Sequence, residues 1–209
     1  MDELISFLEK WQTMIGAIIG GIFALFVALL VAYKARRQED LAAGMLLTGN
    51  LISIIGNGLT LKELAKEQNI KEEQLPYWLS EHLVRQRMKL SPVFEASRIR
   101  LMPNDVYLAA HLELFQLIFN DIDAKIGELS LDIHALDTTG KPIRNQDVLQ
   151  ADARIIYKGF QRVMTHAKCA ERILNHKVLS NYPTFHTIRM LICKSKEEKA
   201  CVRTLKTGE

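Results

Sequence analysis

An uncharged apolar run near the N-terminus constrains this chain more than any other feature. Met14–Ala32 contains no charged or polar residue. As a helix, residues 11–33 would cover roughly 34 Å, enough for a hydrocarbon core about 30 Å thick. Trp11 and Tyr33 stand at the two ends of this stretch, where amphipathic rings prefer the headgroup level. The sequence therefore predicts one transmembrane helix over residues 11–33.

The first ten residues indicate that this helix is an uncleaved signal anchor. A cleaved signal peptide has a basic start, a shorter apolar core and a small-residue cleavage site. Residues 1–10 instead contain Asp2, Glu3 and Glu9 against Lys10 alone. We expect residues 1–10 to form a short segment outside the cytoplasm.

Basic residues on one flank of the span predict its orientation. Lys34, Arg36 and Arg37 follow the apolar run directly, whereas the other flank is acidic. Basic residues resist translocation, so the flank that carries them faces the cytoplasm. This predicts an N-terminus outside, a cytoplasmic domain over residues 34–193 and a charged tail over residues 194–209.

Small residues recur at every fourth position of the span, at Gly16, Gly20, Ala24, Ala28 and Ala32. At this spacing they form a shallow groove along which two helix backbones approach closely. The pattern predicts a pairing face and a homodimer through the transmembrane helix. Gly and Ala are also common in transmembrane helices that do not pair, and this is the alternative interpretation.

A second uncharged run covers residues 41–61 and raises the possibility of a second span. Asn50, Ser53, Asn57 and Thr60 follow a spacing of three, four and three residues, so they would line one face of a helix. Asn is costly at the centre of a membrane. We therefore interpret the run as a half-buried helix that packs on the domain or lies at the membrane surface.

The remaining sequence predicts an all-α fold, a soluble helical bundle behind the single transmembrane helix. Apolar residues at helical spacing predict long helices over 105–129 and 146–177. The first of these is apolar nearly all round in its middle and should be central. Turn and capping residues delimit the shorter helices, with a stop at Gly56-Asn57-Gly58, a capping box at Thr60–Glu63, an end at Asn69 and starts at Pro76, Ser91-Pro92 and Asn104-Asp105. Residues 137–142 predict a turn-rich loop, and a short helix is expected over residues 183–193. No alternating pattern typical of a strand is present.

The overall charge argues against a nucleic-acid partner. The chain has 27 Lys and Arg residues against 24 Asp and Glu residues, a net charge of +3. After residue 33 it carries 26 basic and 21 acidic side chains, a net charge of +5 that is mildly basic and suits an anionic membrane surface. Residues 61–75 superficially resemble the first half of a helix-turn-helix, whose reading helix would begin near Gln74–Tyr77. Glu72, Glu73 and Glu81 occupy the region of the reading helix, where acidic side chains would repel phosphate.

Histidines and cysteines give no convincing metal site. His166 and Cys169 are three residues apart and could share a helix face, but close ligand pairs are missing, so we predict no metal and no other cofactor. The cysteines are Cys169, Cys193 and Cys201, an odd number that predicts reduced thiols facing a cytosol. His111 lies among apolar residues and is predicted to be a core or interface histidine.

Two short segments resemble uncharacterised bacterial membrane-anchored proteins. The first is Trp11-Gln12-Thr13-Met14-Ile15-Gly16 with its apolar span and the following Lys34-Ala35-Arg36-Arg37, and the second is Leu90–Glu95. The resemblance implies a single-pass protein of the bacterial inner membrane with a cytoplasmic helical domain. It implies no activity and transfers no functional residue.

No phosphate-binding loop, dinucleotide fingerprint or nucleophile elbow is present. The sequence therefore favours a non-enzymatic interaction or scaffold protein, bound to a lipid bilayer and to an unknown protein partner. One alternative is a membrane-tethered helical enzyme or ligand-binding domain with an unidentified site. A second is a membrane-bound DNA-binding regulator, for which the sequence provides no basic reading helix.

Overall fold

The computed structural model describes residues 2–134, 145–180 and 201–205, and every element in them is helical. The helices are α1 (Asp2–Glu67), α2 (Leu75–Arg85), α3 (Phe94–Leu101), α4 (Val106–His134) and α5 (Gln146–Ile173), with a 3-10 turn η1 (Met102–Asn104) before α4 and a π-helical turn η2 (Leu174–Val178) after α5. The chain divides into two compact units, Met1–Ala42 and Ala43–Glu209. The all-α prediction is confirmed for these residues.

The first unit consists of the N-terminal part of α1, whose large apolar side chains are exposed. Ile22 is 63% exposed and Phe23 67%, and the same is true around the helix from Met14 to Tyr33. A helix that is apolar all round requires apolar surroundings. By length and apolarity, α1 provides one candidate membrane span, which begins at Met14.

The part of α1 in the second unit packs one face on the domain core. Leu47 and Leu51 are fully buried and Ile54 is 3% exposed. On a neighbouring face, the Oδ1 atom of Asn50 accepts a hydrogen bond from the backbone N–H of Ser91 at 2.9 Å. The interpretation of residues 41–61 as a half-buried helix that packs on the domain is therefore confirmed.

The helix stop predicted at Gly56-Asn57-Gly58 is wrong, and so is the capping box at Thr60–Glu63, because α1 continues to Glu67. Gly58 serves close packing instead of a turn, since a Cβ atom there would lie only 2.8 Å from Cε of Met164. Leu61, which follows, is buried and holds the continuing helix on the core. Tertiary packing thus overrides the local stop signal.

The true end of α1 has a local cause. Asn69 adopts a left-handed backbone conformation with φ of 53°, which Asn tolerates and which ends a helix. The next helix, α2, begins with Pro76 in its first turn, as predicted. The helix predicted to start at Ser91-Pro92 begins later, at Phe94.

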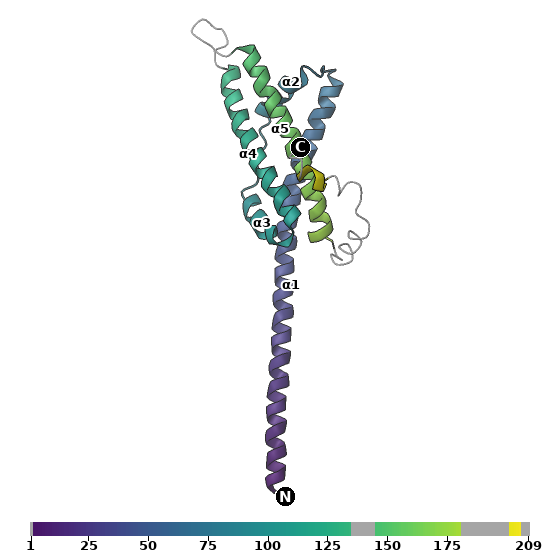
Figure 1. Cartoon of the computed structure of the whole chain (residues 1–209), viewed down its shortest axis with the longest axis vertical. Helices are drawn as coiled ribbons and strands as arrows, with labels where there is room; N and C mark the ends of the chain where they lie inside the picture. Colours follow the sequence, from purple (N-terminus) through teal and green to yellow (C-terminus); the bar gives the residue numbers. More distant parts are fainter. Residues whose placement is uncertain (1, 135–144, 181–200, 206–209) are drawn as a thin grey trace. The chain divides into compact units, whose positions relative to one another are not determined.

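Helices α4 and α5 lie side by side and form the centre of the second unit (Figure 1). Leu108, Leu112 and Phe115 of α4 are fully buried, as are Ile156 and Val163 of α5. Both long helices were predicted from the periodicity of such apolar residues. The Oδ1 atom of Asp105 accepts a hydrogen bond from the backbone N–H of Leu108 at 2.8 Å and caps the start of α4, also as predicted.

Two predicted segments fall outside the described residues. These are the turn-rich loop at residues 137–142 and the short helix at residues 183–193. Of the predicted charged tail, the structure describes residues 201–205, which are helical and mostly half-buried.

Candidate functional site

The predicted pairing face of the span is free of contacts within the described chain. Gly16, Gly20, Ala24, Ala28 and Ala32 are all exposed on α1. No atom outside the helix backbone lies within 4 Å of the position that a Cβ atom would take at Gly16 or Gly20. The face is therefore accessible, and its role in pairing stays a prediction.

The three orientation residues lie on the same helix. Lys34 and Arg36 are exposed on α1, and Arg37 is half-buried. They continue the helix without a break after the apolar stretch. The structure contains no membrane, so the orientation that these residues predict also stays a prediction.

An open groove of about 740 Å³ lies between α4 and α5 and has a mainly apolar lining. The lining includes Leu117 of α4, which is 65% exposed, and Ile155 of α5, which is 48% exposed. Lys158 and Arg162 of α5 line the same groove and are exposed, whereas α4 contributes Asp121. The groove thus combines exposed apolar side chains with a predominantly basic rim.

Gly159 contributes to the shape of this groove. A Cβ atom at this position would lie 2.9 Å from both Cγ1 and Cδ1 of Ile122, which is buried below it on α4. Glycine therefore lets α5 approach Ile122 closely at this point. A larger residue would force Ile122 to move, and this branched side chain has few alternative rotamers.

A second hollow of about 640 Å³ lies beside the start of α2. Its lining includes Glu73, Glu81, Tyr77 and Arg154. It is also open to solvent. Neither hollow is a closed polar pocket in which a nucleophile and a base converge, the arrangement that would favour an enzyme.

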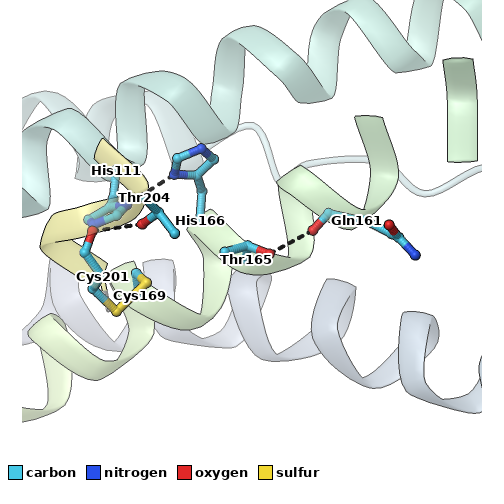
Figure 2. The surroundings of a disulfide bond; sticks show 7 residues. All are labelled: His111, Gln161, Thr165, His166, Cys169, Cys201 and Thr204. Atoms are coloured by element: carbon cyan, nitrogen blue, oxygen red, sulfur yellow. Dashed lines mark hydrogen bonds between the residues drawn. A yellow bond between two sulfur atoms is a disulfide. The ribbon is translucent and has the colours of Figure 1, made fainter. Parts of the chain in front are cut away.

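A buried histidine pair joins α4 to α5. His111 is fully buried and His166 is 3% exposed, and their Nδ1 atoms are 3.0 Å apart (Figure 2). One ring donates this hydrogen bond and the other accepts it, so only one of the two Nδ1 atoms carries a proton. The Nε2 atom of His111 is buried and makes no hydrogen bond of regular geometry within the described residues, but the backbone of Cys201 is close enough to act on this ring and to raise its pKa against the larger effect of burial. The prediction of His111 as a core histidine is confirmed.

Burial controls the charge of this pair. Loss of solvation, followed by the nearby His166, lowers the pKa of His111 from 6.5 to about 4. Loss of solvation and the charge of Arg162 lower the pKa of His166. Both rings are therefore neutral near pH 7, and they act as packed polar groups of the core.

A disulfide bond lies next to the histidine pair. Cys169 of α5 is bonded to Cys201, with 5.7 Å between their Cα atoms (Figure 2). The prediction of reduced thiols is therefore wrong for these two residues. Their separation of 32 residues gave no sign of proximity, because the return of residues 201–205 to α5 is a tertiary feature. Within the part of the chain that the structure describes, no three His, Cys, Asp or Glu residues form a group that could hold a metal ion.

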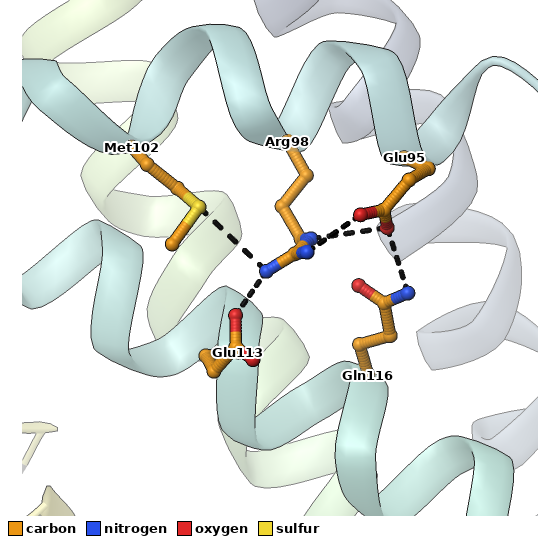
Figure 3. A network of polar contacts seen from close by, with 5 residues as sticks. All are labelled: Glu95, Arg98, Met102, Glu113 and Gln116. Carbon is orange, nitrogen blue, oxygen red and sulfur yellow. Dashed lines mark hydrogen bonds and ion pairs between the residues drawn. The ribbon is translucent and has the colours of Figure 1, made fainter.

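A polar network fixes α3 on α4 (Figure 3). Arg98 of α3 donates to Glu113 of α4 and, over 2.6 Å, to Glu95 of its own helix. Gln116 of α4 donates to Glu95 over 2.7 Å. Arg98 and then Gln116 lower the pKa of Glu95. All four side chains have partners inside the network, so its role is to position α3.

Sequence reasoning missed the groove and the exposed side chains that line it. It placed the helix over 105–129 at the centre of the domain because its middle is apolar nearly all round, yet Leu117 is 65% exposed. The sequence did carry a signal for this exposure, because the helix has more apolar residues than the face that packs on the core can use, and the surplus must lie on the surface. Comparison with known proteins adds no further assignment: no protein family, no curated protein and no solved structure matches this chain.

Proposed function

We propose that this chain is a membrane-anchored interaction protein whose helical domain binds a protein segment in the groove between α4 and α5. The groove itself is the observation that supports this function. Leu117 and Ile155 expose apolar surface side by side with the basic groups of Lys158 and Arg162. A solid core with an open apolar groove is typical of a docking domain.

The chemistry of the groove favours an acidic amphipathic helix as the occupant. Its apolar face would cover Leu117 and Ile155, in the way that amphipathic helices fill apolar grooves in other proteins. Its carboxylates would face Lys158 and Arg162 on the α5 side. Asp121 on the α4 side disfavours acidic residues along that edge and so fixes the orientation of the partner.

Site-specific photocrosslinking in native membranes tests this function. A photoreactive residue at Leu117 or Ile155 should capture the same protein through an acidic amphipathic segment, whereas one at Ile99, an exposed apolar residue of α3, should not. The charge reversal of Lys158 and Arg162 to Glu should reduce both crosslinks. Equal capture from all three positions would contradict a specific site in the groove.

We propose further that α1 crosses a bacterial inner membrane once and leaves the helical domain in the cytoplasm. Lys34, Arg36 and Arg37 support this orientation, because basic flanks remain on the cytoplasmic side. The Cys169–Cys201 disulfide is the observation against it, since disulfides are rare in the cytosol and are usually redox-responsive there. A C-terminal reporter that is active only in the periplasm should stay inactive, and an active reporter would reverse the proposed orientation.

A further inference from the structure

The part of α1 in the second unit has a second apolar face, which is exposed. Met45 is 64% exposed, Ile52 52% and Leu59 44%. Gly49 and Gly56 lie between them, and no atom outside the helix backbone comes within 4 Å of the positions that their Cβ atoms would take. Nothing in the described part of the second unit covers this face. Exposed apolar side chains in such a row mark a contact surface.

The spacing of this row is that of a helix that pairs along its length. Residues 45, 49, 52, 56 and 59 alternate steps of four and three, which is the heptad repeat of coiled coils. We call this row, and its continuation at the same spacing along α1, the seam. The buried face of α1 uses the same steps inside the domain, at Leu47, Leu51, Ile54, Gly58 and Leu61. There the repeat packs against neighbouring helices, and its glycine allows close approach. The exposed row has the same spacing and also contains glycines, but no helix in the described part of the chain packs against it.

The sequence carries this repeat toward the N-terminus. Small residues occupy every seventh position over six heptads, at Gly21, Ala28, Ala35, Ala42, Gly49 and Gly56. All six are exposed. A strict seven-residue repeat predicts a left-handed supercoil with a partner helix of similar length. The four-residue stripe that begins at Gly16 predicts a right-handed crossing instead, although both patterns include Ala28.

Charged residues beside the repeat indicate which helix the partner is. In a parallel, in-register pair of helices, the residue that precedes each position of this seven-residue repeat faces the residue five positions further along the partner helix. Lys62 would then face Glu67 of a second copy, and Lys34 would face Glu39 of a second copy. A parallel, in-register pair of identical helices would thus bring opposite charges together at both places.

We propose that a second copy of this chain binds along this face of α1, parallel and in register, with an apolar contact that extends beyond the membrane span as far as Leu59 and is flanked there by Lys62 of one copy and Glu67 of the other. This inference rests on the proposed membrane anchoring, because a shared bilayer holds both copies of α1 parallel and raises their effective concentration. It does not depend on the groove between α4 and α5. The dimer would present two such grooves to partners.

Sedimentation equilibrium of the full chain in density-matched detergent micelles measures the dimer directly. Gly56→Leu places a large side chain in the seam and should raise the dissociation constant at least tenfold. Asn57→Leu adds the same side chain at the next exposed position, off the seam, and should leave the dissociation constant unchanged. Equal effects of the two substitutions, or a monomeric unmodified chain, would overturn the proposal. Far-UV circular dichroism should be unchanged for both variants, because neither position packs on the core.

A charge swap tests the parallel register. Lys62→Glu should weaken the dimer, and the addition of Glu67→Lys should restore it; a double variant as weak as the single one would overturn the parallel, in-register arrangement. Within the span, Gly21→Leu should weaken pairing more than Gly20→Leu if the heptad repeat governs the contact, and the opposite order would favour the four-residue stripe. The unmodified chain is also reconstituted from detergent into phosphatidylcholine vesicles, and its flotation with them is measured. A chain that floats but stays monomeric contradicts the dimer, whereas a chain that does not float contradicts the anchor.

Discussion

The buried histidine pair makes the stability of the helical domain sensitive to mild acid. An unfolded histidine takes up a proton near pH 6.5, whereas His111 resists protonation in the folded state until about pH 4. Between these values the unfolded state binds more protons than the folded state. The free energy of unfolding therefore falls as the pH falls through this window, and the contribution of the neutral pair is complete only above pH 6.5.

The size of the effect follows from the two pKa values. With a pKa of 6.5 in the unfolded state and about 4 in the folded state, His111 alone lowers the free energy of unfolding by at most about 1.8 kcal/mol between pH 7 and pH 5. His111 is fully buried by surface area, but solvent still screens part of the charge, so we expect a loss of about 1–1.5 kcal/mol. His166, whose pKa is also lowered, changes in the same direction. Glu95 contributes only at lower pH, because Arg98 and Gln116 hold its pKa below 4.5.

Urea unfolding of the full chain in detergent micelles, followed by far-UV circular dichroism at pH 7 and pH 5, measures this loss. The control is the double variant His111→Leu/His166→Leu, which removes both polar partners together and so leaves neither unpaired in the core. Asp105 and Arg162, the charged groups that act on the pair, are unchanged in it. An equally large loss between pH 7 and pH 5 in the double variant would refute the assignment of this pH dependence to the histidine pair.

Two further predictions use the same unfolding assay at pH 7. Leu112→Ala removes a fully buried side chain between α4 and its neighbours and should cost about 2–5 kcal/mol, whereas Leu117→Ala in the exposed groove should change stability by less than about 0.5 kcal/mol. Similar costs for the two would contradict the assignment of core and groove. Cys169→Ser should lower the free energy of unfolding by about 3 kcal/mol, because the disulfide closes a long loop. A reductant should have the same effect on the unmodified chain and none on the variant, and a reductant without effect on the unmodified chain would show that the bond does not contribute to stability.

Local sequence patterns predicted the helices well where one face meets the core. The periodicity around Leu112 and Ile156 located α4 and α5, and Asp105 and Asn69 marked a helix start and a helix end, because capping and burial act over a few residues. Gly56-Asn57-Gly58 predicted a helix stop where α1 in fact continues, because the role of a glycine depends on what packs against it. Met164, which lies far along the sequence, decides that Gly58 is an interior helix residue.

The candidate sites were less predictable because they depend on tertiary proximity. The groove requires Leu117 and Ile155 to lie next to each other on separate helices, and the disulfide requires Cys201 to return to Cys169. Neither follows from spacing along the chain. The heptad repeat of small residues was visible in the sequence, but its significance depends on the exposure of Met45, Ile52 and Leu59.

Alkaline carbonate extraction of membranes from cells that express the full chain tests membrane anchoring by α1 most directly. The unmodified chain should remain in the membrane pellet. The double variant Ile22→Arg/Leu25→Arg places two charges in the exposed apolar stretch, at a cost of roughly 5–7 kcal/mol for insertion, and should move the chain to the soluble fraction. Release of the unmodified chain by carbonate would contradict the membrane anchor.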